Sequence, residues 1–197
     1  MIIVLNGASS SGKTTLARAL QASWEAPLVY LSLDGLIGML PFHYSGSGSR
    51  AHEGVELYPA TEDGYLATGF RMGPAAHRLN LQLARFAASV AADGFEVVVD
   101  HIFLNEAMFA PFREALDLET TYLVGVRCTL DEQLRREAAR EDRMPGLARF
   151  QSARVHWIRP LYDLDLDTTS TSPDTLAAEV VSYVRSGQPP RLAAARP

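Results

Sequence analysis

Short apolar runs alternate along this chain with longer stretches of helical periodicity. The apolar runs predict buried strands at residues 1–6, 28–33, 95–100 and 120–128. The spacing of apolar residues between them predicts helices at about 15–21, 36–40, 74–92, 105–116, 129–142, 147–157 and 173–184. Residues 162–167 alternate apolar and acidic side chains, which is typical of a fifth, half-exposed strand. Strands that alternate with helices indicate an α/β domain with a mostly parallel five-stranded sheet.

Two segments do not fit this alternation. Residues 42–72 are rich in Gly, Ser and aromatic side chains, and within them Val55–Tyr58 and Tyr65–Thr68 flank the turn sequence around Asp63 and predict a small hairpin. A long stretch without helix inside a compact domain is usually functional. Residues 186–197 are rich in Pro, Ala and Arg, so we expect a disordered tail after a single domain at 1–185.

The strand at 1–6 leads into a phosphate-binding motif. The pattern G-x-x-x-x-G-K-[ST] is matched by Gly7, Ala8, Ser9, Ser10, Ser11, Gly12, Lys13 and Thr14, and the helix follows at Thr15. Glycines let the backbone turn its N–H groups inward around phosphate oxygens, and the start of the helix adds its positive dipole end. Lys13, the single lysine of the chain, is predicted to contact the outer phosphates, and Thr14 to bind Mg²⁺.

Composition narrows the function classes. A formal net charge of -5 over 197 residues argues against a nucleic-acid partner, because wrapping a nucleic acid requires a basic face. No apolar run approaches the length of about 20 residues that a membrane span needs, and no secretory signal precedes the first strand. Cys128 is the single cysteine, which fits a core thiol in a reducing cytoplasm.

Two acidic residues follow predicted strands that should neighbour the P-loop. Asp34 comes after the strand at 28–33, and Asp100 after the three valines at 97–99, as the carboxylate of a Walker B motif follows an apolar strand. Asp100 is therefore predicted to bind Mg²⁺ together with Thr14. The alternative interpretation of Asp100 is an acidic residue that forms a turn at the end of the strand. Asp34 is either the N-cap of the next short helix or a general base for a substrate hydroxyl. His101, next to Asp100, is a candidate pocket residue.

Three arginines share one face of the predicted helix at 129–142. Arg136, Arg140 and Arg143 are spaced by four and three residues, and Pro145 and Gly146 follow as a possible hinge. One interpretation is a lid at about 136–150 that brings guanidinium groups over a transferring phosphate. The other is a solvated helix face with local ion pairs. Thr129 and Glu132 also match a capping box, and Arg127 is a candidate for the sugar or base of a nucleotide.

Taken together, several segments resemble the chloramphenicol phosphotransferase-like family of P-loop kinases. Besides the P-loop, the resemblance rests on the runs 33–37, 97–104, 124–128, 140–143 and 162–169. It implies a three-layer α/β/α P-loop NTPase fold, similar to adenylate and shikimate kinases, and an ATP-dependent O-phosphotransferase. It also implies that Asp34 is the general base, that Arg140 and Arg143 are lid arginines with Arg136 beside them, and that the adenine-proximal loop lies near Thr168.

The sequence therefore predicts a kinase that uses ATP and Mg²⁺ to phosphorylate a hydroxyl group of a small molecule, for example an antibiotic. Segment 42–72 is predicted to be an acceptor-side insertion whose pocket is formed by Phe42, His43, Tyr44, Tyr58, Tyr65, Phe70 and Met72. Two alternatives stay open. One is a nucleotide or metabolite kinase whose anionic acceptor binds Arg50, Arg71 or Arg78; the other is a module that binds or slowly hydrolyses nucleotides. The acceptor and the oligomeric state are not specified by the sequence.

Overall fold

A computed structural model of the protein describes residues 1–140 and 144–194. Its centre is a five-stranded sheet in the order β2-β6-β1-β7-β8, in which every pair of neighbours is parallel. The strands are β1 (Ile2–Asn6), β2 (Leu28–Ser32), β6 (Glu96–His101), β7 (Thr121–Arg127) and β8 (Leu164–Asp167). The predicted α/β fold class with a five-stranded sheet is confirmed, and the central sheet, predicted to be mostly parallel, is fully parallel.

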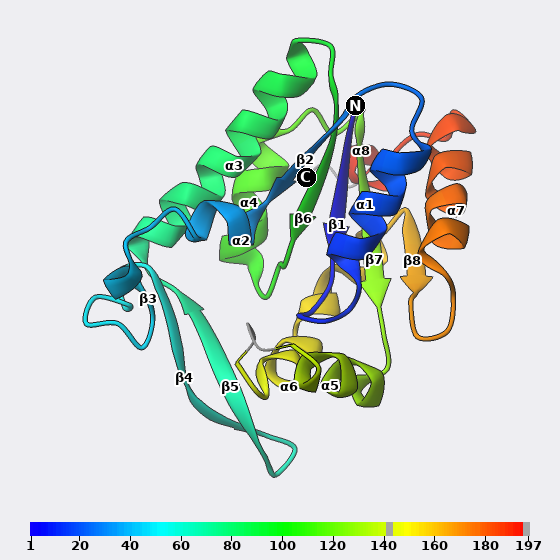
Figure 1. The fold of residues 1–197 in the computed structure, drawn as a ribbon. Helices are drawn as coiled ribbons and strands as arrows, with labels where there is room; N and C mark the ends of the chain where they lie inside the picture. Colours follow the sequence, from blue (N-terminus) through cyan, green and yellow to red (C-terminus); the bar gives the residue numbers. More distant parts are fainter. Residues whose placement is uncertain (141–143, 195–197) are drawn as a thin grey trace.

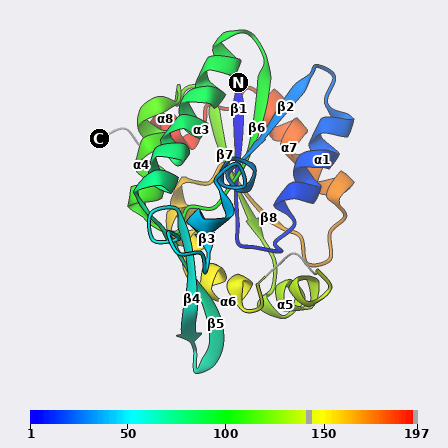
Figure 2. The same ribbon diagram turned by 60° about the vertical axis from the view of Figure 1, so that its left-hand side comes forward.

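Helices cover both faces of this sheet, as Figures 1 and 2 show. On one face, α1 (Lys13–Ser23) and α7 (Pro173–Arg185) pack on Ile3 and Leu5 of β1. On the other, α3 (Pro74–Ala92) and α4 (Glu106–Ala115) pack on Ile2 and Val4. All five residues of β1 are buried, in agreement with the apolar run at 2–5, and the polar Asn6 at its end is buried as well.

The carboxyl ends of the strands carry the remaining elements (Figure 1). A second small sheet, β3-β4-β5, projects there from the body of the protein. The strands of this small sheet are β3 (Ser45–Gly46), β4 (Val55–Glu62) and β5 (Tyr65–Met72). The helical elements at the same end are α2 (Leu33–Ile37), α5 (Leu130–Ala138), α6 (Leu147–Ser152) and the 3₁₀ segments Phe42–Tyr44 and Val155–Leu161. The predicted hairpin is present but longer than its turn signal indicated, because β4 and β5 pair over eight residues each.

The helix after β2 begins earlier than predicted. Its N-cap is Ser32, whose hydroxyl accepts the N–H of Gly35, and its first residue, Leu33, is buried in the core. Asp34 therefore lies in the first helical turn rather than at the cap. The predicted capping box at Thr129 is wrong, because Glu132 binds Arg135 and Arg136 instead and the Thr129 side chain makes no cap bond.

Residues 186–194 of the predicted tail belong to the described part of the chain; residues 186–189 are exposed, whereas Pro190 and Leu192 are buried. This segment includes the short helix α8 (Arg191–Ala194), whose Leu192 joins the core beneath α4. The N–H of Arg191 donates to Asp163, and the hydroxyl of Tyr122 donates to the carbonyl of Gln188. Residues 195–197 lie outside the described part of the chain. None of the described helices is both long and apolar enough to cross a membrane.

Candidate active site

The P-loop is a tight, buried turn between β1 and α1. Gly7 packs so closely on β7 that a Cβ there would collide with the carbonyl oxygen of Val126. Ser10 and Gly12 adopt left-handed backbone conformations, with φ of 59° and 94°. The hydroxyl oxygens of Ser9, Ser10 and Ser11 are buried without a hydrogen-bond partner in the described part of the chain. Because unpaired buried hydroxyls are costly, this loop is suited to a ligand with several hydrogen-bond acceptors, as a phosphate group is.

Lys13 and Thr14 meet Asp100 at the mouth of the loop. The hydroxyl of Thr14 donates to Oδ2 of Asp100 at 2.7 Å, and Nζ of Lys13 lies 3.8 Å from Oδ1. Lys13 also donates to the carbonyl of Ala8 at 2.8 Å. Tyr30 donates to the same carboxylate, and its pKa is raised by burial and by the negative charge of Asp100. Asp100 lies within β6, so it is not a turn residue.

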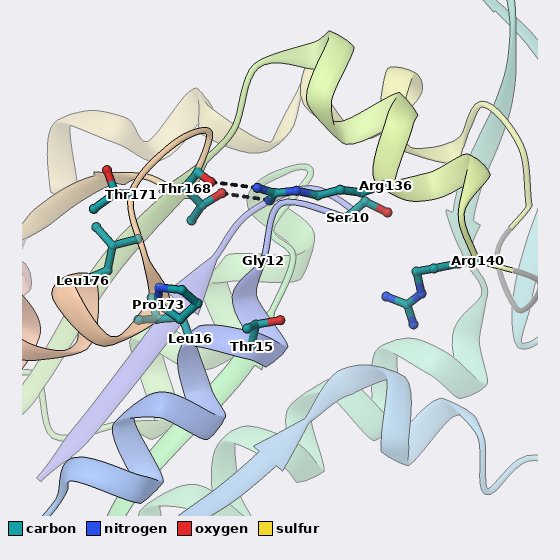
Figure 3. A pocket seen from close by; sticks show the side chains of 10 residues that line it. All are labelled: Ser10, Gly12, Thr15, Leu16, Arg136, Arg140, Thr168, Thr171, Pro173 and Leu176. Carbon is teal, nitrogen blue, oxygen red and sulfur yellow. Dashed lines mark hydrogen bonds between the residues drawn. The ribbon is translucent and has the colours of Figure 1, made fainter.

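Two cavities adjoin the P-loop and share Ser10, Gly12, Thr15 and Arg140. The smaller cavity, of about 340 Å³, lies between α1 and the loop that joins β8 to α7 (Figure 3). The remaining side chains around it are Leu16, Arg136, Thr168, Thr171, Pro173 and Leu176. Its size and partly apolar walls suit the nucleoside part of a nucleotide.

The larger cavity, of about 630 Å³, extends from Lys13 toward the β4–β5 hairpin. Asp34, Asp100 and Lys13 all line it, so the ends of β1, β2 and β6 converge on one cleft as the topology predicts. Away from the P-loop and the two acidic residues, its lining is mostly aliphatic and aromatic, with Ile37, Phe42, Val55, Leu57, Phe70, Ile102, Met144 and Leu147, and it also includes the polar side chains of Ser32, Ser45 and Ser47. Among the described lining residues, Lys13 and Arg140 are the cationic ones.

Arg136 is held beside the P-loop by a defined set of contacts. Its guanidinium donates to the hydroxyl and the carbonyl of Thr168, at 3.2 and 2.7 Å, and to Glu132 at 2.8 Å (Figure 3). The Thr168 hydroxyl in turn donates to the carbonyl of Ser11 at 2.7 Å. Arg136 and Thr168 therefore fasten α5 and the end of β8 to the phosphate-binding loop.

The other predicted arginines have different surroundings. Arg140 lines both cavities and extends in Figure 3 from the segment after α5 toward Thr15. Arg127 lines neither cavity; it pairs with Asp165 at 2.6 Å on the edge strand β8. The prediction for Arg143 falls on 141–143, outside the described residues. On either side of that segment, buried Glu137 accepts the N–H groups of Gly146 and Ala148, so the ends of α5 and α6 are joined.

Of the residues predicted to form an apolar acceptor pocket, Phe42 and Phe70 line the larger cavity and the other five do not. Met72 is buried in the core beneath α3, and Tyr58 packs edge-on against Phe150. His43, Tyr44 and Tyr65 do not line the cavity either. Tyr65 lies exposed under Arg149, and the ring of Tyr44 lies under Arg50 and at a tilted angle to His43. The register of β4 could not be derived from the sequence, so the places of Val55 and Leu57 in the cavity wall could not be predicted.

His101 is buried beside the larger cavity. Its ring stacks on Phe103 at 3.9 Å, and Nε2 lies 2.6 Å from the amide oxygen of Asn80, whose own nitrogen donates to the carbonyl of Met108. Nε2 is therefore the protonated nitrogen. Burial, and then the charge of Lys13, lower the pKa of His101 to about 3. It is a neutral side chain of the cavity wall.

The arginines proposed for an anionic acceptor lie elsewhere. Arg50 pairs with Glu53 and Arg71 with Glu56, both on the surface, and Arg78 is exposed on α3. None of the three lines either cavity. One further polar residue was not anticipated from the sequence: Gln151 of α6, 142 residues from Ser9, accepts the N–H of that P-loop residue at 2.6 Å.

Comparison with known proteins gives consistent matches along the chain. The model of a family described as "Chloramphenicol phosphotransferase-like protein" matches residues 1–185. A curated Mycobacterium tuberculosis protein (strain H37Rv) named "Putative O-phosphotransferase" is 27% identical over 190 residues, covering 91% of this chain and 80% of that protein.

Three solved structures with a similar fold are more distant in sequence than this relative. A sugar kinase from Janibacter sp. HTCC2649 has a TM-score of 0.67 at 19% identity and covers 98% of this chain and 97% of its own. The Mycobacterium tuberculosis APS kinase in complex with AMPPNP and APS has a TM-score of 0.62 at 19% identity, covering 93% and 96%. Shikimate kinase from Acinetobacter baumannii has a TM-score of 0.59 at 13% identity, covering 95% and 94%. At these identities the similarity shows a shared fold.

Proposed function

Because this chain belongs to the chloramphenicol phosphotransferase-like family and is thereby a kinase, we propose that it moves the γ-phosphate of ATP to a hydroxyl group of an uncharged, largely apolar small molecule. The observation that carries this proposal is the larger cavity, in which Lys13 and Asp34 line one continuous space. That space has the P-loop at one end and an apolar wall at the other.

The donor end is suited to a nucleotide triphosphate. The buried serine hydroxyls of the loop lack protein partners in the described chain, which supports phosphate binding at 7–15. Lys13 neutralises the outer phosphates, and the smaller cavity takes the nucleoside, with Thr168 in its wall. Arg127 has no part in this nucleotide site, because it pairs with Asp165 and lines neither cavity.

Thr14 and Asp100 are the residues that fit Mg²⁺, since a hydroxyl and a carboxylate oxygen already converge there at 2.7 Å. Bound Mg²⁺ supplies charge neutralisation on the phosphate oxygens. The chain offers no closed protein cage: its described residues hold no cluster of three or more His, Cys, Asp or Glu side chains. This agrees with an ion held mainly by phosphates and water.

At the acceptor end, Asp34 orients the substrate hydroxyl and takes its proton as the oxygen attacks phosphorus. Arg140 lines both cavities and stabilises the charge on the transferring group, with Arg136 fixed behind the loop. Since the acceptor end contains no described cation besides Arg140, an uncharged acceptor is favoured over a carboxylate or phosphate ester. An antibiotic alcohol such as chloramphenicol belongs to this class. We expect the enzyme to act in the cytoplasm, where ATP is present and Cys128 stays reduced.

The test is a screen of ATP consumption with mass detection of a phosphorylated product. The panel contains uncharged hydroxylated antibiotics and sugars, and the anionic acceptors shikimate, gluconate and nucleoside monophosphates. We expect the wild-type protein to form product from uncharged acceptors. In Asp34→Asn this activity should fall by about 100-fold or more, while the affinity for ATP is retained. The exposed residue Asp93, changed to Asn, is the matched control. Product from anionic acceptors alone would refute the proposed substrate class, and nucleotide binding without transfer to any acceptor would refute the kinase assignment.

A further inference from the structure

Gln151 connects α6 to the phosphate-binding loop. Its Oε1 accepts the backbone N–H of Ser9 at 2.6 Å, and the side chain is only 4% exposed. An N–H group can only donate, so the amide atom that faces Ser9 must be the oxygen and not the nitrogen. This contact removes the Ser9 N–H from the set of loop donors that a phosphate could use.

The nitrogen of the same amide is left as an unused donor. Nε2 carries two hydrogens and has no hydrogen-bond partner in the described part of the chain, yet Gln151 lines the larger cavity with Lys13 and Asp34. It is not a buried orphan atom like the serine hydroxyls of the loop. With Oε1 fixed on Ser9, Nε2 is the other branch of the same planar amide, and because Gln151 lines the larger cavity this donor is available to a ligand there.

The position of Gln151 is fixed by its neighbours. Glu137 binds the N-terminal N–H groups of α6, and the next residue, Ser152, donates to Gln133 at 2.6 Å. Gln133 in turn donates to the carbonyl of Cys128 at the end of β7. A side chain placed this firmly loses little conformational freedom when it binds a ligand.

We propose that Gln151 is a γ-phosphate-binding residue, which keeps Oε1 on Ser9 and donates a hydrogen bond from Nε2 to a γ-phosphate oxygen of ATP. The inference rests on the proposed function, because it requires ATP on the P-loop. The γ-phosphate is the group that must lie between the loop and the acceptor end, where Gln151 lines the cavity. A neutral amide there adds a donor without adding a charge to the acceptor end.

The test compares MgATP with MgADP, because only ATP carries the γ-phosphate. Gln151→Glu keeps an acceptor for the Ser9 N–H and replaces the donor with a second carboxylate oxygen. Isothermal titration should show MgATP affinity reduced by about 10-fold or more, with MgADP affinity nearly unchanged. Gln151→Ala should also weaken MgATP more than MgADP. Gln82→Glu on the exposed side of α3 makes the same charge change and should alter neither affinity.

A residue that only stabilises the P-loop and does not contact the γ-phosphate would give a different pattern of affinities. In that case Gln151→Ala weakens both nucleotides by the same factor and Gln151→Glu changes neither, which would overturn the inference. If both variants lose their fold, the side-chain amide NMR signal of Gln151 in the wild-type protein decides. It should shift with MgATP and not with MgADP, and an equal shift with both would overturn the inference. Wild-type protein that binds neither nucleotide would refute the proposed function itself.

Discussion

The hydroxyl of Thr14 donates to the carboxylate of Asp100 over 2.7 Å and joins the first turn of α1 to the end of β6. The two residues are 86 positions apart in the chain, and Lys13 lies 3.8 Å from the other oxygen of the same carboxylate. One carboxylate therefore orders both side chains that end the P-loop motif. This arrangement places a hydroxyl, a carboxylate and an ammonium group around one point of the larger cavity.

Removal of either partner of this hydrogen bond should raise the Mg²⁺ requirement. We expect Thr14→Val and Asp100→Asn each to need about 10–100-fold more Mg²⁺ for half-maximal phosphotransfer, since an oxygen ligand or its orienting partner is lost. The measurement is a Mg²⁺ titration at saturating ATP. Thr14→Ser keeps the hydroxyl and serves as the control. Unchanged Mg²⁺ dependence in both variants would show that the pair has only a structural role.

The single lysine makes a chemical labelling experiment specific. MgATP should protect Lys13 from an amine-acylating reagent, because a bound phosphate covers the ammonium group, which is already only 12% exposed. Peptide mass spectrometry separates this site from the amino group of Met1, which is the internal reference. Lys13→Met should lower phosphotransfer by about 100-fold or more. Equal labelling of Lys13 with and without MgATP would contradict nucleotide binding at the loop.

Thr168 should contribute to both stability and nucleotide binding. Thr168→Val retains the shape but leaves the carbonyl of Ser11 without its 2.7 Å donor and removes an acceptor from Arg136. We expect the free energy of unfolding to fall by about 1–3 kcal/mol in urea denaturation, and ATP affinity to fall with it. Thr61→Val, on the exposed side of the hairpin, is the control and should leave both quantities nearly unchanged. A variant as stable as the wild type would show that water replaces the missing hydroxyl.

Stability should decrease in mild acid because of His101. In the folded protein its pKa is about 3, whereas in the unfolded chain it is about 6.5, so below pH 6.5 the unfolded chain binds the proton and the folded protein does not. Protonation then favours unfolding, and between pH 6.5 and pH 5 the contribution is about 2 kcal/mol. The loss continues until the pH reaches the folded value. His156, whose pKa burial lowers to about 4, acts in the same direction.

His101→Gln tests this assignment, because glutamine does not titrate and can still donate to Asn80. The difference in melting temperature between pH 7 and pH 5 should be smaller in this variant than in the wild type. His52→Gln changes an exposed histidine and should leave that difference unaltered. If His101→Gln shows the same acid dependence as the wild type, other groups cause the acid sensitivity.

The central fold could be predicted because its signals are local. The apolar runs of β1, β6 and β7 are buried on both faces of a parallel sheet, so they read as strands without any knowledge of their partners. The C-terminal end of the chain was harder to predict. The composition of residues 186–194 suggests disorder, but Leu192 and the bond from Arg191 to Asp163 pack them against the sheet. Contacts of this kind have no local signature.

The sequence by itself determined the phosphate-binding loop, the parallel α/β sheet, and the positions of Asp34 and Asp100 at neighbouring strand ends, because a motif and a hydrophobic period are carried by consecutive residues. Tertiary structure alone decided which groups share the cavity. It placed Val55 and Leu57 in the wall in place of most of the aromatic residues, withdrew Arg127 into an ion pair, and brought Gln151 to Ser9. These outcomes depend on strand register and on packing between residues that are 38 (Arg127 and Asp165) or 142 (Ser9 and Gln151) positions apart, which no single stretch of sequence records.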